Sequence, residues 1–152
     1  MQLESDDRWM RAAIEEAKAA KAAGDLPFGA VVVRNGEVAG RGGATNGTTG
    51  DVTDHAEMAA LRAACKALGR NTLSDCTIVC TNEPCNMCAS AIFQAMIPVV
   101  VMGASRRDLS GLLRERKISI AELAADAGYE VTLRGGVLRA EVLQLFADVH
   151  RA

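Results

Sequence analysis

Short apolar segments of strand character alternate along this chain with longer segments of helical periodicity. Strand–helix–strand units of this kind run parallel and place helices on both faces of one sheet. Asn35-Gly36 adds an antiparallel hairpin. We predict an α/β fold, a three-layer α/β/α sandwich with a mixed central sheet of about five strands. The predicted helices are 7–23, 55–68, 85–95, 109–127 (interrupted near 116–119) and 137–149, and the strands are 28–33, 37–43, 76–81, 99–102 and 130–133.

The 152 residues fit one domain, 1–152, because a domain usually takes roughly 100 to 200 residues. The chain carries 17 basic and 19 acidic side chains, a net charge of −2. This balance provides no general attraction to a phosphate backbone. We therefore expect a small-molecule ligand rather than nucleic acid. The charged run 114–117 is interpreted as exposed surface, with a small RNA-facing patch as the alternative.

The first 26 residues alternate charged residues with alanine and contain no apolar core of a signal peptide. No apolar run approaches the roughly 20 residues that cross a bilayer. We predict a cytoplasmic protein without a membrane segment. In a reducing compartment, thiols more often bind metal or lie buried than form disulfides. The chain has an odd set of five: Cys65, Cys76, Cys80, Cys85 and Cys88.

Two of these cysteines have the spacing of metal ligands. Cys85 and Cys88 share one face at the start of a predicted helix, where the helix N-terminus favours thiolates. His55 begins another predicted helix, and the two helices start at the same sheet edge if the strands 28–33 and 76–81 are neighbours. We predict one zinc ion held by His55, Cys85 and Cys88, with a fourth position open for water that the metal activates.

Glu57 follows His55 by two residues, a spacing that brings both into one site only at an irregular first turn of the helix. There it serves as the general acid and base that accepts the water proton and later protonates a leaving amine. The expected reaction releases ammonia.

Three alternatives remain at this point. Cys85 and Cys88 are also compatible with a redox pair. Cys80, as a fourth thiolate, would close the zinc site and make it structural. A zinc-stabilised interaction module without catalysis would keep the metal and give Glu57 no role.

His55-Ala56-Glu57 followed by Pro84-Cys85-Asn86-Met87-Cys88 matches the signature of zinc-dependent nucleobase deaminases. With Pro27-Phe28-Gly29-Ala30-Val31, the chain resembles the cytidine deaminase-like superfamily, in the branch of guanine deaminases and tRNA adenosine deaminases. Residues 27–103 carry this resemblance, and residues 104–152 match only in outline. It implies the same zinc ligands, Glu57 as proton shuttle, and a homodimer.

The resemblance also implies substrate contacts. Asn46 corresponds to a loop asparagine that hydrogen-bonds the substrate ring, although its spacing to His55 is shorter than in relatives. The backbone N–H groups of Ala56 and Cys85 would stabilise developing charge. Phe28 replaces a smaller residue and could pack on a planar base, as in guanine deaminases. Glu83 is either a substrate contact or simply an acidic residue beside a helix start.

We therefore predict a zinc-dependent aminohydrolase that deaminates a free nucleobase or related heterocycle, guanine-type first and cytosine- or triazine-type second. The alternative of the same chemistry is a tRNA adenosine deaminase, against which the near balance of charge argues. For the homodimer, Ile92, Phe93, Met96 and Ile97 are an interface candidate, although we favour the core for most of them.

Overall fold

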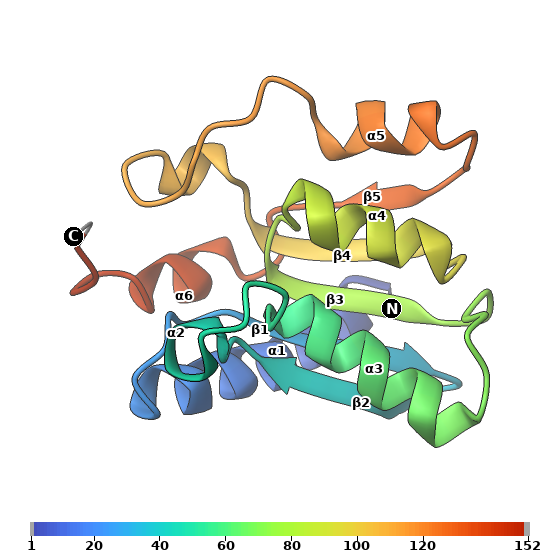
Figure 1. Ribbon diagram of the computed structural model, residues 1–152, viewed down its shortest axis with the longest axis horizontal. Helices are drawn as coiled ribbons and strands as arrows, with labels where there is room; N and C mark the ends of the chain where they lie inside the picture. The colour runs from blue at the N-terminus through green and yellow to red at the C-terminus, as the bar shows by residue number, and fades with distance from the viewer. Residues whose placement is uncertain (1, 151–152) are drawn as a thin grey trace.

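One five-stranded sheet runs through the computed structural model, which describes residues 2–150 (Figure 1). Its strands are β1 (Gly29–Arg34), β2 (Glu37–Gly43), β3 (Thr77–Asn82), β4 (Val99–Ala104) and β5 (Thr132–Arg134). They lie in the order β2-β1-β3-β4-β5. β1 pairs antiparallel with β2 and β3, whereas β4 pairs parallel with β3 and β5. The predicted mixed sheet is confirmed.

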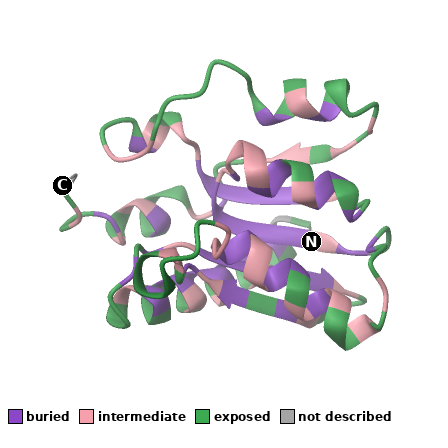
Figure 2. Ribbon diagram, viewed as in Figure 1, coloured by how far each residue is buried: buried purple, intermediate pink, exposed green. Residues whose placement is uncertain are grey.

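Helices cover both faces of this sheet. They are α1 (Gln2–Ala22), the short α2 (Asn46–Thr49), α3 (Ala56–Leu68), α4 (Asn86–Gln94), the 3-10 turn η1 (Arg107–Leu109), α5 (Ile120–Asp126) and α6 (Arg139–Gln144). Ala30 and Val32 pack in one apolar cluster with α3, α4 and α5, while Val31 and Val33 pack in a second cluster with α1 and α6. The central strands β1, β3 and β4 are largely buried, whereas the edge strands β2 and β5 are more exposed (Figure 2). The three-layer prediction is therefore confirmed.

The topology brings the starts of α3 and α4 together. β2 and β3 both run antiparallel to β1, so they point in the same direction and their carboxyl ends lie at one edge of the sheet. α3 follows β2 after the short α2, and α4 follows β3 directly. Both helices consequently begin at this edge, as the sequence predicted from neighbouring strands β1 and β3.

Gly42 permits close packing of β2 on the first turn of α3. A Cβ atom at this position would lie 2.7 Å from the backbone oxygen of Ala56 and 2.8 Å from the backbone nitrogen of Ala60. These are fixed backbone atoms, so only glycine allows the helix start to lie this near the strand.

The predicted helix 109–127 is wrong over most of its length, because only α5 forms. Residues 114–119 are exposed and offer no apolar stripe to the core. α5 begins where Ser119 and Glu122 form a capping box, with hydrogen bonds of 3.1 and 2.7 Å. The predicted helix 137–149 is likewise reduced to α6.

The apolar set considered for a dimer interface belongs mostly to the core. Ile92 and Ile97 are completely buried and Phe93 is 6% exposed, whereas Met96 is 47% exposed. The homodimer stays a prediction. Among residues 2–150, no helix combines the length and the apolar character needed to cross a membrane.

Candidate active site

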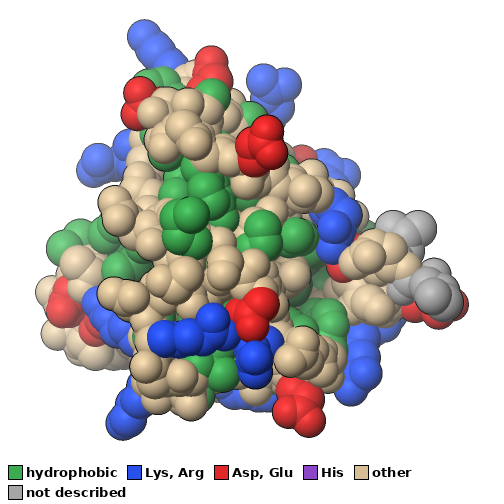
Figure 3. All heavy atoms as spheres, turned by 90° about the vertical axis from the view of Figure 1, so that its right-hand side faces the viewer, with side chains coloured by type: hydrophobic (Ala, Val, Ile, Leu, Met, Phe, Trp, Pro, Cys, Tyr) green, Lys and Arg blue, Asp and Glu red, His purple; other side chains and the backbone are tan. Residues whose placement is uncertain are grey.

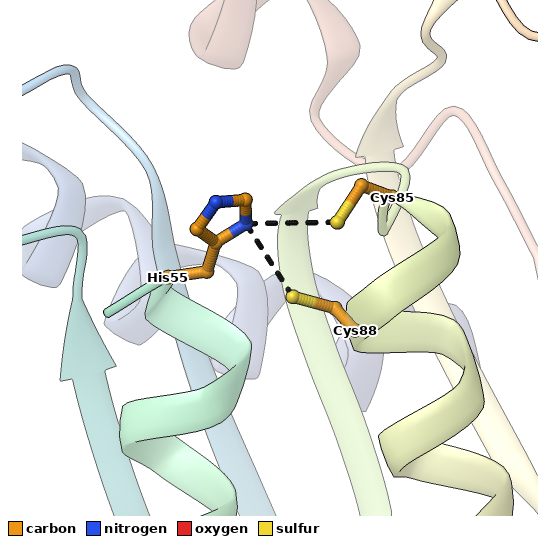
Figure 4. A group of neighbouring side chains, drawn as sticks. All are labelled: His55, Cys85 and Cys88. Carbon is orange, nitrogen blue, oxygen red and sulfur yellow. Dashed lines mark hydrogen bonds between the residues drawn. The ribbon is translucent and has the colours of Figure 1, made fainter. Parts of the chain in front are cut away.

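His55, Cys85 and Cys88 converge at the sheet edge where α3 and α4 begin. His55 is the N-cap residue of α3 and Cys85 that of α4, while Cys88 lies in the first turn of α4. Nδ1 of His55 lies 3.6 Å from Sγ of Cys85 and 3.5 Å from Sγ of Cys88 (Figure 4). The three ligand atoms lie within 4.8 Å of one another. The three predicted ligands are therefore neighbours and point toward a common centre.

This geometry fits zinc. Bonds of about 2.0–2.1 Å to nitrogen and 2.3 Å to sulfur at a tetrahedral angle require a nitrogen–sulfur separation of about 3.6 Å. Both separations from Nδ1 of His55 meet this value. Within the described residues, Cys80 is not part of the ligand group. Burial raises the pKa of the Cys80 thiol well above its usual value, so it stays protonated in the core. Three protein ligands leave one tetrahedral position open.

The surroundings favour thiolate at Cys85. A hydrogen bond from the Cys88 thiol, with help from the backbone N–H groups of Cys88 and Met87, lowers the pKa of Cys85 to about 5. The N-terminal end of α4 adds positive potential at the same place. A cation binding between the sulfurs would therefore find at least one ligand already deprotonated.

Glu57 lies beside the ligand group. It occupies the first turn of α3 and is only 6% exposed, although it lines the cavity described below. Burial raises the pKa of its carboxyl group, and a hydrogen bond with Cys88 opposes that shift. A carboxyl group whose pKa lies above the usual range exchanges protons more readily near neutral pH.

A cavity of about 540 Å³ opens over these residues. It is lined by the ligands His55 and Cys85, by Glu57, and by each predicted substrate contact: Phe28, Asn46, Ala56 and Glu83. Phe28 also packs edge-on against Phe146, with ring centroids 5.4 Å apart. Asn46 begins α2 at the cavity wall. All predicted site residues except Cys88 thus line this one cavity, and Cys88 lies beside it in the ligand group.

The cavity wall also contains Asn82 and Arg106, which were not predicted as site residues. Arg114 and Arg116 come from the charged run 114–117, for which a small RNA-facing patch was the alternative prediction. Asn82 ends β3 and is 3% exposed. Arg106, Arg114 and Arg116 lie at the cavity in the irregular segment between β4 and α5. The signal for Asn82 was a polar residue at the carboxyl end of an apolar strand, where sites form in such sheets.

The sequence of this chain is similar to sequences of known proteins. The family model described as "Cytidine and deoxycytidylate deaminase zinc-binding region" matches residues 3–104. The tRNA-specific adenosine deaminase of Bacillus subtilis is 43% identical over 99 residues, which cover 65% of this chain and 62% of that protein. The tRNA(Ile)-lysidine synthase of Deinococcus radiodurans is 42% identical over 127 residues, 82% of this chain. The chain spans only 21% of the length of that synthase.

Solved structures share the fold. One, from studies of A-to-I editing by tRNA:A34 deaminases at the wobble position of tRNA, has a TM-score of 0.79 and 31% identity, covering 91% of this chain and 98% of its own. The guanine deaminase of Bacillus subtilis has a TM-score of 0.64 and 35% identity, covering 81% of this chain and 69% of its own. The predicted fold, zinc cofactor and deaminase class are confirmed at the level of the family.

Two predictions are wrong. Curated relatives at 33–43% identity are named tRNA-specific adenosine deaminases, which contradicts the preference for a free guanine-, cytosine- or triazine-type base. The same relatives contradict the expectation that nucleic acid is not a partner. The physical reason is local: net charge averages over the whole chain, whereas three arginines gather at the cavity.

Proposed function

This chain belongs to the cytidine and deoxycytidylate deaminase family, and we propose that it removes the amino group of an adenosine held within tRNA. The observation that carries this proposal is the set of three arginines at the cavity, Arg106, Arg114 and Arg116. A tRNA substrate agrees with the predicted cytoplasmic location.

The three arginines can bind phosphate because, among the described residues, no carboxylate forms an ion pair with their guanidinium groups. Among residues 2–150, none of the three forms an ion pair with an acidic side chain. By contrast, Arg34 and Arg70 each bind Asp75 at 2.6 Å. Figure 3 shows the end of the molecule opposite the cavity, where basic and acidic side chains are mixed. A neutral free base offers no negative charge to three guanidinium groups that have no acidic partner in the described part of the chain, whereas the backbone of an RNA loop does.

The chemistry follows from the ligand group and Glu57. His55, Cys85 and Cys88 would hold zinc, which supplies an activated water when bound. Glu57 accepts one proton of the water and passes it to a ring nitrogen, then transfers the second proton of that water to the departing amino group. The ring carbon gains oxygen as its bond to the amino nitrogen breaks, so adenosine and water become inosine and ammonia.

Other cavity residues hold the base. The backbone N–H groups of Ala56 and Cys85 stabilise the developing negative charge. Phe28 provides an apolar ring against the target base, since base–aromatic stacking tolerates any planar heterocycle. Asn46 and Glu83 offer hydrogen-bonding groups to the base edge.

The test measures inosine in RNA. Zinc-loaded protein is incubated with tRNA transcripts that carry adenosine in the anticodon loop, and in parallel with free guanine, cytosine and adenine. We expect inosine in tRNA and no ammonia from the free bases. The Glu57→Gln variant should keep its zinc and lose at least about a thousandfold in rate, because proton transfer is removed.

Two results would contradict the proposal. Ammonia from a free base without inosine in any transcript would restore a small-molecule substrate. Undiminished inosine formation by Glu57→Gln would show that Glu57 is not the proton shuttle on which the proposed mechanism depends.

A further inference from the structure

Asn82 is a buried polar residue without a complete set of hydrogen bonds. It ends β3, is 3% exposed and lines the cavity that also holds Glu57 and Ala56. Its Nδ2 has no hydrogen-bond partner among the described residues. Buried amide groups are nearly always paired in folded proteins, so an unpaired donor at a cavity wall points to a ligand acceptor.

The orientation of this amide is determined by its neighbours. The backbone N–H of Gly29 donates to Oγ1 of Thr81 at 3.0 Å, and the Thr81 hydroxyl donates to Oδ1 of Asn82 at 2.7 Å. In this arrangement the Thr81 hydroxyl accepts one hydrogen bond and donates one. Oδ1 of Asn82 is therefore the acceptor of the chain, and Nδ2 lies on the other side of the amide.

The position relative to the reacting groups defines what Nδ2 can meet. Asn82 pairs in register with Ala104 of β4, whereas Glu57 comes from α3. Glu57 serves the ring nitrogen next to the carbon that loses its amino group. A donor on a different element is available to another edge of the purine, where N3 and N7 carry lone pairs without hydrogens.

We propose that Asn82 is a specificity-determining residue that donates a hydrogen bond from Nδ2 to N3 or N7 of the target adenine. This inference rests on the proposed function, because the base it reads is the adenosine of tRNA. It selects a nitrogen lone pair over a C–H group at that position, since a ligand that lacks the acceptor leaves the buried donor unpaired.

The test pairs a change in the protein with a change in the base. Synthetic RNA hairpins carry adenosine, 3-deazaadenosine or 7-deazaadenosine at the target position, so that one ring nitrogen becomes C–H. Each is assayed with the wild-type chain, with Asn82→Leu and with Asn82→Asp. Asn71→Leu is the matched control, because Asn71 is exposed and does not line the cavity.

We expect Asn82→Leu to raise KM on the adenosine hairpin about tenfold with kcat changed less than about threefold. Asn82→Asp keeps the size and the acceptor for Thr81 but presents oxygen to the base, so we expect a larger loss in kcat/KM than for Asn82→Leu. For the wild-type chain, kcat/KM should be about tenfold lower on one of the two deaza hairpins than on the adenosine hairpin. For Asn82→Leu, kcat/KM should be the same on both. Asn71→Leu should behave as wild type on all hairpins.

The outcomes are distinct. If the wild-type chain deaminates the adenosine hairpin but the effects of Asn82→Leu and both deaza bases simply multiply, Asn82 does not read N3 or N7 and the inference is wrong. The same holds if Asn82→Leu and Asn82→Asp change only zinc content or Tm. If the wild-type chain deaminates no RNA, the proposed function fails and this inference fails with it.

Discussion

Arg106 donates a hydrogen bond of 2.7 Å from Nη2 to the backbone carbonyl oxygen of Arg114. Both residues line the cavity, so this bond closes the irregular segment between them into a loop at the site. Nε of Arg106 is buried and has no partner among the described residues. The side chain of Arg106 therefore holds the backbone of this loop in place, and the loop places cationic groups at the cavity.

Arg114 and Arg116 should supply part of the attraction to RNA. Replacing both by alanine is expected to weaken tRNA binding and to reduce the slope of log Kd against log salt by about 1.5 to 2, because each phosphate contact releases about one counterion. Arg11→Ala, at an exposed position of α1, is the control and should keep the wild-type slope. Fluorescence anisotropy across a salt series measures both. An unchanged slope in the double variant would exclude these arginines as phosphate contacts.

Gly42→Ala should disturb the active site indirectly. The added Cβ would lie 2.5 to 2.8 Å from atoms of the first turn of α3, the turn that carries Glu57 and follows His55. We expect a loss of about 1–3 kcal/mol in the free energy of unfolding and a weaker affinity for zinc. Gly135→Ala, where an added Cβ meets nothing within 4 Å, should be neutral. Chemical denaturation and zinc titration check this, and wild-type zinc affinity in Gly42→Ala would refute the role given to this contact.

Removal of zinc should lower stability. Metal that binds only the folded chain at 100 times its Kd adds about 2.7 kcal/mol, or roughly 5–10 °C in Tm for a chain of this size. Chelation should therefore lower the Tm of the wild-type protein and leave that of Cys88→Ala unaffected. Cys65→Ala, outside the ligand group, should retain one zinc per chain and the response to chelator. Equal zinc content in both cysteine variants, by elemental analysis, would contradict the ligand set.

Asp108 should make the stability of the loop region depend on acid. The guanidinium of Arg139 binds it through two hydrogen bonds of 2.9 and 2.5 Å and lowers the pKa of its carboxyl group, aided by Ser105. A lowered pKa contributes stability above the unfolded value of about 3.9, and this contribution is lost as pH falls through the native value.

Asp108→Asn is accordingly expected to lower Tm at pH 7 by about 2–4 °C, for a loss of about 1 kcal/mol. The difference from wild type should stay constant down to about pH 5 and shrink below pH 4. Thermal melts at several pH values measure it. A difference that grows in acid would show that the carboxylate of Asp108 does not carry the effect.

Much of the site could be predicted from the chain because its chemistry lies in short motifs. His55, Cys85 and Cys88 each stand at a helix start, and the order of strands brings those starts to one sheet edge. Glu57 lies beside this group because His55 is the N-cap residue with extended backbone, which is the irregular helix start that their spacing required. The helix predicted at 109–127 failed because helical periodicity needs a surface to pack on, and residues 114–119 have none.

The sequence alone was sufficient to predict the sheet, the zinc ligand group and the family, and it proposed Glu57 as the proton shuttle. It could not reveal the polarity of the cavity, because that depends on which distant segments meet there. Charges act over about 8 Å at physiological salt, so the field at the cavity comes from the charged groups that line it, among them three arginines, and not from the net charge of −2. Only the tertiary structure placed those arginines, and the unpaired amide of Asn82, around the same space as Glu57.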